Sequence, residues 1–323
     1  MITAYRCENG SLRPTQVDSG DSIEPAAIWI DLRHPTAEEE AAVEKFLGID
    51  VPTRDEMREI EISSRLYQLG PALFMTASIL YRSAGNDLLL EPLTFVLGTN
   101  RLITVRYSDP MPISQYVRQS QLGDVPCSNA LDVFAGLLEA FVDRLADVLE
   151  NVQRETDGLS AQIFTHPDEL DEELEYAEVL RGIGRAQMTT SRVRESLVSI
   201  SRLLSYVTRY RQAEQDAGLA ELLKTVRRDV GSLSDQATFL ASNITFLLDA
   251  TLGVISSEQT DVTKIFSILA TLFLPPTLIA SIYGMNFHVM PELNWAWGYP
   301  AAIALMVLSA VLSYWFVRLK GWL

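Results

Sequence analysis

The sequence predicts an α/β domain, then long helices, the last of which runs into the first of two C-terminal transmembrane helices. Strand-like runs lie in the first third of the chain, and charge is nearly absent from the last fifth. From Lys264 onward the charged residues are Lys264, Arg318, Lys320 and Glu292. Residues 1–263 carry the other 23 bases and 41 acids, a net charge of −18. This segregation excludes a plain cytosolic enzyme, a disordered chain and a nucleic-acid binder, which needs a basic face.

Two stretches near the C-terminus are long enough to cross a membrane. Residues 265–291 and 293–317 contain no Asp, Glu, Lys or Arg, and a transmembrane helix needs about 20 mostly apolar residues. We therefore expect spans at about 264–283 and 299–318, joined by an external loop at 287–298 and followed by a tail at 319–323. The alternative, a buried hairpin in a soluble core, is disfavoured because uncharged runs of this length are rare there.

The charges that flank the spans predict their orientation. Arg318 and Lys320 directly follow the second span, whereas the connecting loop has neither Lys nor Arg. By the positive-inside rule both termini are cytoplasmic. Residues 1–16 show no apolar signal core. We expect a multi-pass protein of the cell (inner) membrane, with the lipid bilayer as a partner.

Residues 1–128 form the predicted cytoplasmic α/β domain with a mixed sheet. Strand-like segments rich in β-branched and aromatic residues occur at Ala27–Leu32, Ala72–Tyr81 and Leu93–Val105. The last of these contains a Gly-Thr-Asn turn between two apolar runs, which predicts a hairpin. A short helical pattern lies at Ala37–Leu47.

The next part of the chain is helical. We expect cytoplasmic helices within 129–217, at about 129–164 and 168–211, and then a break at Asp216–Gly218. The stalk helix, 218–286, would run into the membrane. Its apolar positions recur at steps of 4 and 3, which predicts a packed left-handed supercoil. The residues of this seam are Leu219, Leu223, Val226, Val230, Leu233, Ala237, Leu240, Ile244, Leu247, Thr251 and Val254. Such a stalk would be a mechanical coupler; the alternative is a bundle helix that merely abuts the span.

No pattern in the sequence indicates catalysis. A phosphate-binding glycine loop and a nucleophile motif are both missing. The three histidines lie far apart, and Cys7 and Cys127 have no spacing that suggests a disulfide framework or a zinc site. We expect no enzyme activity, no nucleotide, no nucleic acid and no cofactor. The dense acidic run at 168–178 is either a solvated face or an attractor of divalent cations.

The first span carries a stripe of small, polar and apolar residues. Thr277 and Ser281 lie one turn apart, and the same face carries Leu274, Ala270, Phe266 or Ser267, and Thr263. A two-span hairpin cannot enclose a polar path, so several copies would have to surround an axis for this face to line a pore. The alternative is a tight helix–helix contact. Pro275 and Pro276 either kink the span or also expose freed carbonyls to a polar path.

The residues after this span carry a family resemblance. The array Tyr283-Gly284-Met285-Asn286-Phe287, Met290-Pro291-Glu292-Leu293, Trp295 and Gly298-Tyr299-Pro300 lies between the two spans. It resembles the CorA family of magnesium transporters, as do the preceding FLPPTLIASIYGMN and the closing KGWL. The resemblance extends, less specifically, over most of the chain.

This resemblance implies a funnel-shaped homopentamer in which the stalk and first span line the pore. Gly284, Met285 and Asn286 match the family signature at the outer mouth, where Asn286 oxygens would hold a hydrated cation. Mg²⁺ sheds water reluctantly, and conduction needs binding weak enough to release the ion. Glu292 in the loop either attracts cations or is simply solvated.

The implied function is Mg²⁺ influx driven by the membrane potential, with Co²⁺ and Ni²⁺ as further substrates. Cytoplasmic Mg²⁺ would act as a regulatory ligand, and Asp249 falls where family members carry a stalk carboxylate that binds it. Leu274 and Phe266 match apolar constrictions of the pore. Two alternatives remain open: a zinc transporter of the ZntB kind, and a non-conducting, membrane-anchored oligomeric scaffold.

Overall fold

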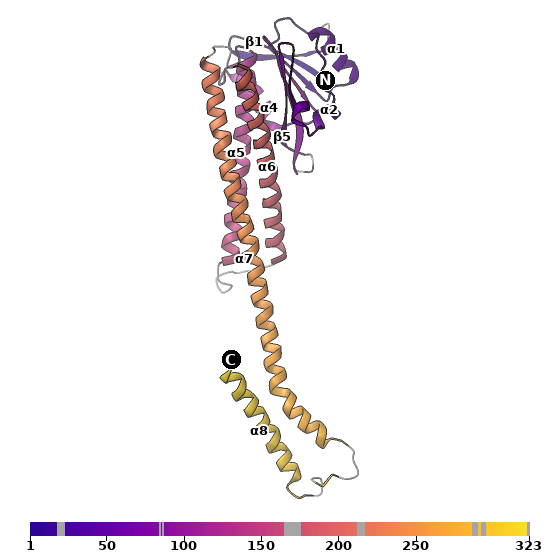
Figure 1. Cartoon of the computed structure of the whole chain (residues 1–323), viewed down its shortest axis with the longest axis vertical. Helices are drawn as coiled ribbons and strands as arrows, with labels where there is room; N and C mark the ends of the chain where they lie inside the picture. The colour runs from indigo at the N-terminus through magenta and orange to yellow at the C-terminus, as the bar shows by residue number, and fades with distance from the viewer. Residues whose placement is uncertain are drawn as a thin grey trace. The chain divides into compact units, whose positions relative to one another are not determined.

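The computed structural model describes residues 1–17, 23–83, 85, 87–164, 176–211, 217–285, 290–291 and 295–321. The chain divides into two compact units, Met1–Leu248 and Asp249–Leu323. The first unit contains a sheet and most of the helices. The second unit consists of the rest of the longest helix and one further helix (Figure 1).

The first unit is built on a mixed sheet. Its described strands follow the order β2-β1-β3-β7-β6-β5-β4. β3 and β7 pair in parallel, whereas the other neighbours are antiparallel, which confirms the predicted mixed sheet. The strands are β1 (Ile2–Glu8), β2 (Ser11–Val17), β3 (Trp29–Arg33), β4 (Leu66–Leu69), β5 (Ala72–Arg82), β6 (Leu88–Leu97) and β7 (Leu102–Arg106).

The predicted hairpin is confirmed, whereas the hairpin at the N-terminus was missed. β6 and β7 pair antiparallel around the Gly-Thr-Asn turn, with Leu97 opposite Leu102. At the N-terminus β1 and β2 form a hairpin closed by Asn9 and Gly10, whose φ angles are 52° and 79°. An Asn-Gly pair tolerates the positive φ that tight hairpin turns require, so this dipeptide was the available signal.

Each face of the sheet is covered by helices. One face packs under α1 (Ala37–Leu47, as predicted) and α2 (Arg54–Arg58), in a core that includes Ile30, Val43 and Met57. A capping box fixes the start of α1, because Thr36 and Glu39 exchange side-chain and backbone hydrogen bonds. A short helix, α3 (Ile62–Arg65), leads into β4.

The other face packs against α4 (Met111–Leu122), α5 (Ala130–Phe164) and α6 (Tyr176–Arg211). Phe95 of β6 contacts Phe134 of α5 edge-on, with ring centroids 5.4 Å apart. Tyr116 of α4 meets Trp29 in the same way at 6.3 Å. Farther along, α6 is fixed to β5 because the Ser78 N–H donates to Ser199 Oγ at 2.9 Å. The first unit is therefore a three-layer α/β/α structure.

The long helices agree closely with their predicted ranges. α5 ends at Phe164 and α6 ends at Arg211, as the periodicity indicated, while residues 165–175 lie outside the described part. α7 (Ala217–Tyr283) begins earlier than expected, so the predicted break at Asp216–Gly218 is wrong for its last two residues.

The predicted seam of α7 is buried in the first unit. Ala237, Leu240, Ile244 and Leu247 expose 3% or less of their surface. Leu223, Val226 and Val230 are also buried, whereas Leu233 is half-buried. Phe246 stacks on Phe164 of α5 at a centroid distance of 6.1 Å. The 4-3 spacing thus predicted correctly which face of α7 packs inside the chain.

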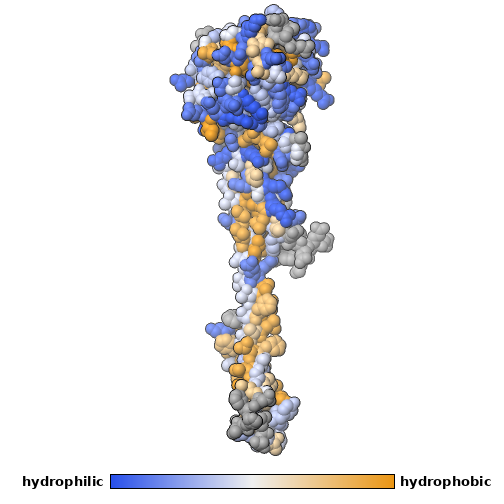
Figure 2. All heavy atoms as spheres, turned by 90° about the vertical axis from the view of Figure 1, so that its right-hand side faces the viewer, coloured by the Kyte–Doolittle hydropathy of each residue, from blue (hydrophilic) through white to orange (hydrophobic). Residues whose placement is uncertain are grey.

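The second unit contains two helices that are long and apolar enough to cross a membrane. The first is the continuation of α7, which remains helical through Pro275 and Pro276. The second is α8 (Gly298–Leu319), whose bounds lie within a residue of those predicted for the second span. Figure 2 shows hydrophobic side chains on the surface of these helices, as expected for segments that face lipid or other copies of the chain.

Candidate functional site

The six predicted pore residues lie on one exposed face of α7. Leu274 exposes 69% of its surface and Phe266 exposes 67%. Thr263, Ala270, Thr277 and Ser281 are exposed as well. Leu272, Ile279 and Tyr283, which belong to the opposite side of the helix, are half-buried. The stripe is therefore free of contacts within the chain and is available to a neighbouring molecule, lipid or water.

Three hydroxyl groups of this segment donate their protons back to the helix backbone. Thr263 donates to the Gln259 carbonyl at 2.8 Å, and Thr277 donates to the Phe273 carbonyl at 2.7 Å. Ser267 makes the same bond at 2.8 Å. Because each hydroxyl spends its one proton this way, its oxygen retains lone pairs for an outside donor. A hydrated cation presents O–H donors, so this surface matches a cation with its water shell better than an anion.

Pro275 and Pro276 remove two hydrogen bonds from the middle of the span. Proline has no N–H, so the carbonyls of Thr271 and Leu272 receive no backbone bond from four residues onward. The helix nevertheless continues to Tyr283. Two backbone oxygens are thereby left to bond with water or neighbouring side chains, which is how membrane helices accommodate proline.

α7 ends directly at the signature triplet. The Gly284 N–H donates to the Ala280 carbonyl at 2.9 Å, and the Met285 N–H donates to the Ile282 carbonyl at 3.3 Å. A Cβ atom on residue 284 would lie 3.1 Å from the Ala280 carbonyl oxygen, which is closer than most Cβ contacts in proteins. Glycine therefore fits this helix end better than a residue with a side chain. Met285 is exposed. Asn286 and Glu292 lie outside the described residues, and their roles stay predictions.

Asp249 is an exposed residue of α7 at the start of the second unit. Across the described ranges, no three His, Cys, Asp or Glu side chains come close enough to hold a metal ion. Most of the acidic run at 168–178 falls in the undescribed segment 165–175. A regulatory site at Asp249 therefore stays a prediction.

The structure brings Asp229 of α7 into the neighbourhood of acidic residues of α5, a grouping that sequence reasoning missed. Burial and the neighbouring charges of Asp143 and Asp229 raise the pKa of Glu139. Burial, Asp147 and Asp229 likewise raise the pKa of Asp143. Glu139 and Asp143 lie on α5, one turn apart, whereas Asp229 lies on α7. Helical spacing predicts the pair on α5, but the approach of Asp229 depends on how the helices pack.

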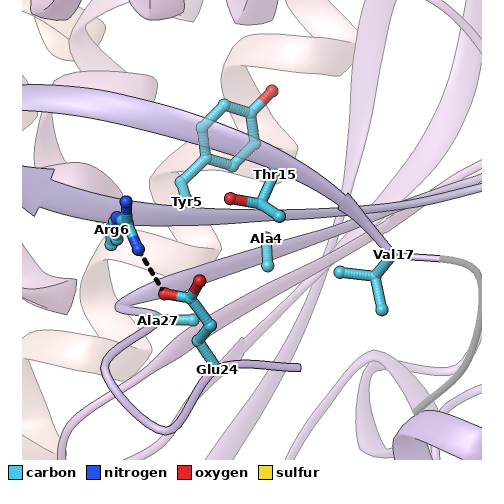
Figure 3. A pocket seen from close by; sticks show the side chains of 7 residues that line it. All are labelled: Ala4, Tyr5, Arg6, Thr15, Val17, Glu24 and Ala27. Carbon is cyan, nitrogen blue, oxygen red and sulfur yellow. Dashed lines mark hydrogen bonds and ion pairs between the residues drawn. The ribbon is translucent and has the colours of Figure 1, made fainter. Parts of the chain in front are cut away.

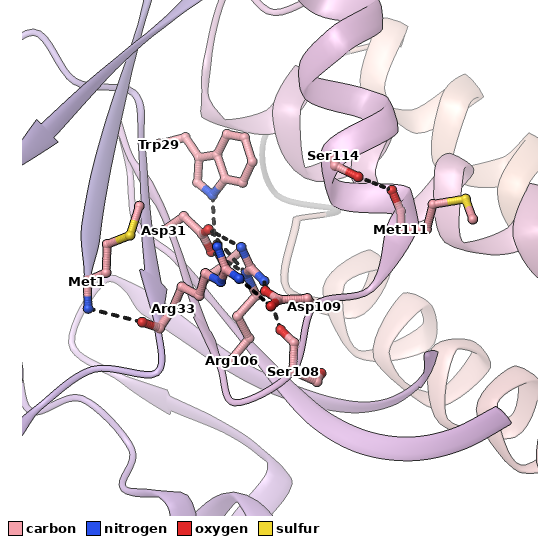
Figure 4. A network of polar contacts seen from close by, with 10 residues as sticks. Met1, Trp29, Asp31, Arg33, Arg106, Ser108, Asp109, Met111 and Ser114 are labelled. Carbon is pink, nitrogen blue, oxygen red and sulfur yellow. Dashed lines mark hydrogen bonds and ion pairs between the residues drawn. The ribbon is translucent and has the colours of Figure 1, made fainter. Parts of the chain in front are cut away.

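A buried polar network crosses the parallel strands β3 and β7 (Figure 4). Arg106 Nη2 lies 2.9 Å from Asp31 Oδ2, and both residues expose less than a tenth of their surface. Thr104 donates to Asp31 Oδ1 at 2.7 Å, and Trp29 Nε1 donates to Thr104 at 3.0 Å. Asp109 accepts from Arg106 Nη1 at 2.6 Å. The polar side chains of Trp29, Asp31, Thr104 and Arg106 are thus hydrogen-bonded to one another or to Asp109. This network has a structural role, because buried polar groups need hydrogen-bond partners.

The hollow on β1 and β2 offers no ligand site. It is lined by Tyr5, Thr15, Val17 and others, and Arg6 Nη1 bridges it to Glu24 Oε2 at 2.7 Å (Figure 3). It has no volume that a water molecule can enter.

The similarity of this chain to known proteins extends over its whole length. A family model described as "CorA-like Mg2+ transporter protein" matches residues 24–319. The magnesium transport protein CorA of Pectobacterium atrosepticum is 32% identical over 323 residues, which is 100% of both chains. The CorA protein of Escherichia coli strain K12 is also 32% identical over the full length of both chains.

Solved structures show the same fold. The complete CorA magnesium transporter from Methanocaldococcus jannaschii aligns with a TM-score of 0.79 at 20% identity, covering 100% of this chain and 99% of that one. The ZntB cytoplasmic domain from Vibrio parahaemolyticus aligns with a TM-score of 0.59 at 9% identity, over 79% of this chain and 98% of that one, and shows a fold likeness alone. With a family model over nearly every residue, full-length relatives and two membrane-length helices, this chain is a membrane protein of the CorA-like Mg²⁺ transporter family.

Proposed function

We propose that five copies of this chain surround an axis and conduct Mg²⁺ into the cytoplasm of the cell across its inner membrane. The observation that carries the proposal is the position of Gly284 and Met285 at the end of a membrane-length helix, with Asn286 next in sequence. Carboxamide oxygens from five chains would meet at the outer end of the path. The number five is the one that the family resemblance implies.

The exposed stripe of α7 is the surface that the copies would share. A single hairpin leaves Thr277 and Ser281 facing outward, where hydrocarbon would be a poor environment for them. Around an axis, the same side chains line a narrow polar path. α8, which is mostly apolar and carries no charge before Arg318, would then face lipid.

The chemistry of the stripe suits a hydrated divalent ion. The hydroxyl oxygens of Thr263 and Thr277 accept hydrogen bonds, as the Asn286 carboxamide oxygen would, and none carries a full charge. Neutral oxygens hold the water shell of Mg²⁺ without stripping or trapping the ion, and conduction requires that release. Co²⁺ and Ni²⁺ are proposed as further substrates because they are divalent and share the octahedral water shell.

The driving force is electrical. Moving one divalent ion through 100 mV is worth about 4.6 kcal/mol, twice the value for a single charge. An inside-negative potential therefore drives Mg²⁺ inward with no nucleotide hydrolysis. Glu292 in the external loop would raise the local concentration of cations at the mouth.

Gating would use the apolar members of the stripe. Rings of Leu274 and Phe266 are bulky enough to close a narrow path by excluding water. Mg²⁺ bound at Asp249 would neutralise carboxylates between subunits and hold the closed state. Asp249→Asn is then expected to keep flux high when cytoplasmic Mg²⁺ is raised, whereas Asp235→Asn, an exposed acid of the same helix, keeps normal inhibition.

The test is Mg²⁺ entry into proteoliposomes that contain a Mg²⁺-sensitive dye. Asn286→Ala is compared with the native chain and with Asn294→Ala, which alters another asparagine of the same connection. The proposal expects loss of entry for Asn286→Ala alone, with the same assembly for all three by size-exclusion chromatography. Equal entry in all three would remove Asn286 from the path. Zn²⁺ entry with no Mg²⁺ entry would instead favour a zinc transporter, and no movement of any ion would favour a scaffold.

A further inference from the structure

The two cysteines of the chain meet in the first unit although they are 120 positions apart. Cys7 Sγ and Cys127 Sγ lie 3.5 Å from each other, and both are free thiols. Cys7 belongs to β1, and Cys127 lies in the connection between α4 and α5. Cys127 also donates to the carbonyl of Gly10, 3.2 Å away, in the β1–β2 turn. The contact therefore joins the N-terminal hairpin to the segment that starts α5.

The two thiols differ in access. Cys7 is half-buried on β1, where it pairs in register with the fully buried Leu12. Cys127 exposes 1% of its surface. Cys7 is thus the residue of the pair that is partly open to solvent, whereas Cys127 is shielded from it. Such a pair has one sulfur that can react with an outside reagent and one that can react only with its neighbour.

We propose that Cys7 and Cys127 are a modification site that takes up a reversible disulfide from a low-molecular-weight disulfide such as glutathione disulfide. The Cys7 thiolate attacks one glutathione sulfur, the glutathione S–S bond breaks, and one glutathione thiolate leaves. Cys127 loses its proton to water and attacks the Cys7 sulfur. The bond from Cys7 to glutathione breaks and the second glutathione leaves. Two protein thiols are oxidised, and one disulfide is reduced to two thiols.

The geometry favours the second step over a lasting adduct on Cys7. A disulfide bond is about 2.0 Å long, so the two sulfurs need a closing movement of roughly 1.5 Å from their present contact. Burial, the contact with Cys7 and the charge of Asp132 raise the pKa of Cys127 to about 12. Because the thiolate is the nucleophile, Cys127 is inert toward distant reagents. It reacts only with a sulfur already held against it.

A bond at this position would constrain the first unit. It would close a loop of about 120 residues and link the β1–β2 turn to the start of α5. Constraining so long a loop lowers the entropy of the unfolded chain, so the oxidised form melts at a higher temperature. In a reducing cytoplasm the pair stays open, and it closes when the glutathione pool becomes oxidised.

The experiment uses the full chain in detergent, equilibrated in buffers of increasing glutathione disulfide to glutathione ratio. Free thiols are alkylated under native conditions and mapped by mass spectrometry, and melting is followed in parallel. The native chain is expected to gain an internal Cys7–Cys127 disulfide and a higher melting temperature, both reversed by reductant. Cys127→Ser is expected to retain glutathione on Cys7, and Cys7→Ser to leave Cys127 unmodified.

Two results would overturn the proposal. One is a native chain that accumulates glutathione on Cys7 with no internal bond. The other is a native chain in which both thiols stay free in a fully oxidising buffer while the protein remains folded. Both results come from the native chain, so they count even where a serine variant folds poorly.

Discussion

Asp31 and Arg106 form a buried ion pair across the parallel strands β3 and β7. Arg106 Nε lies 3.1 Å from each Asp31 carboxylate oxygen, and Nη2 adds a third bond at 2.9 Å. Burial alone would lower the pKa of Arg106, but Asp31 and Asp109 together raise it. The guanidinium therefore stays charged in the interior, and removal of Asp31 leaves it with the half-exposed Asp109 as its counter-charge.

Removing one partner is expected to destabilise the first unit strongly. Asp31→Ala removes the buried counter-charge of Arg106 and leaves the half-exposed Asp109 in its place, which costs roughly 3 kcal/mol in free energy of unfolding. Asp109→Ala removes a half-exposed partner of Arg106 and Arg33 and should cost about 1 kcal/mol or less. Urea unfolding of the full chain, followed by far-UV circular dichroism, measures both. Equal losses for the two variants would contradict the account of the pair.

The carboxylates between α5 and α7 should make stability depend on pH. The pKa values of Glu139 and Asp143 are raised in the folded state, so the folded chain binds their protons more tightly than the unfolded chain. Ionisation thus penalises the folded state above those pKa values, and the penalty disappears as pH falls through them. Asp143→Asn is expected to raise the melting temperature at pH 7.

The size of that increase is itself a test. It should shrink as the pH falls toward 4, because the native carboxyl then becomes neutral as well. Asp235→Asn is the matched control, since Asp235 is exposed on α7. An increase of the same size at both pH values, or an equal increase for the control, would show that charge repulsion is not the cause.

The sequence predicted the parts of this fold that repeat along the chain. Periodicity located α5 and α7 and identified the buried face of α7 through Leu240, Ile244 and Leu247. Such patterns depend on residues within a few turns of one another. The spans also follow from local composition, because a bilayer requires a long apolar run.

That reasoning could not predict contacts between residues that lie far apart in the sequence. Asp31 and Arg106 lie 75 positions apart, and their contact follows from the parallel pairing of β3 with β7. Cys7 and Cys127 meet through the packing of the N-terminal hairpin, which was itself missed although Asn9-Gly10 marks its turn. In the candidate pore, helical spacing alone predicted that Thr277 and Leu274 lie on the same face of α7. Whether that face lines a pore depends on other copies of the chain.

Gly284 is expected to be needed at the end of α7. A methyl group there would lie 3.1 Å from the Ala280 carbonyl oxygen and would displace the start of the signature triplet. Gly284→Ala should therefore reduce Mg²⁺ flux several-fold. Gly231→Ala, which adds a methyl in open space within the same helix, should keep full flux and gain about 1 kcal/mol of helix stability. Flux and circular dichroism on both variants decide the matter, and normal flux for Gly284→Ala would refute the steric argument.

Leu274 is expected to act as a hydrophobic barrier. Leu274→Asn introduces a side chain that holds water in the path, so flux should persist at cytoplasmic Mg²⁺ concentrations that close the native protein. Leu312→Asn places the same group on α8, the helix proposed to face lipid, and should leave inhibition unchanged in protein that still assembles. Dye-reported uptake at low and high lumenal Mg²⁺ compares them. Identical inhibition of the Leu274 variant and the native chain would argue against a barrier at this position.

The central claim is that this chain forms a path through which the membrane potential alone drives Mg²⁺. The most direct measurement sets Mg²⁺ equal on both sides of proteoliposomes, below the concentration that closes the path, and then imposes an inside-negative K⁺ diffusion potential. The account predicts net Mg²⁺ entry that grows with the imposed potential and disappears in Asn286→Ala. Entry that ignores the potential, or that is the same in the Asn286 variant, would contradict it.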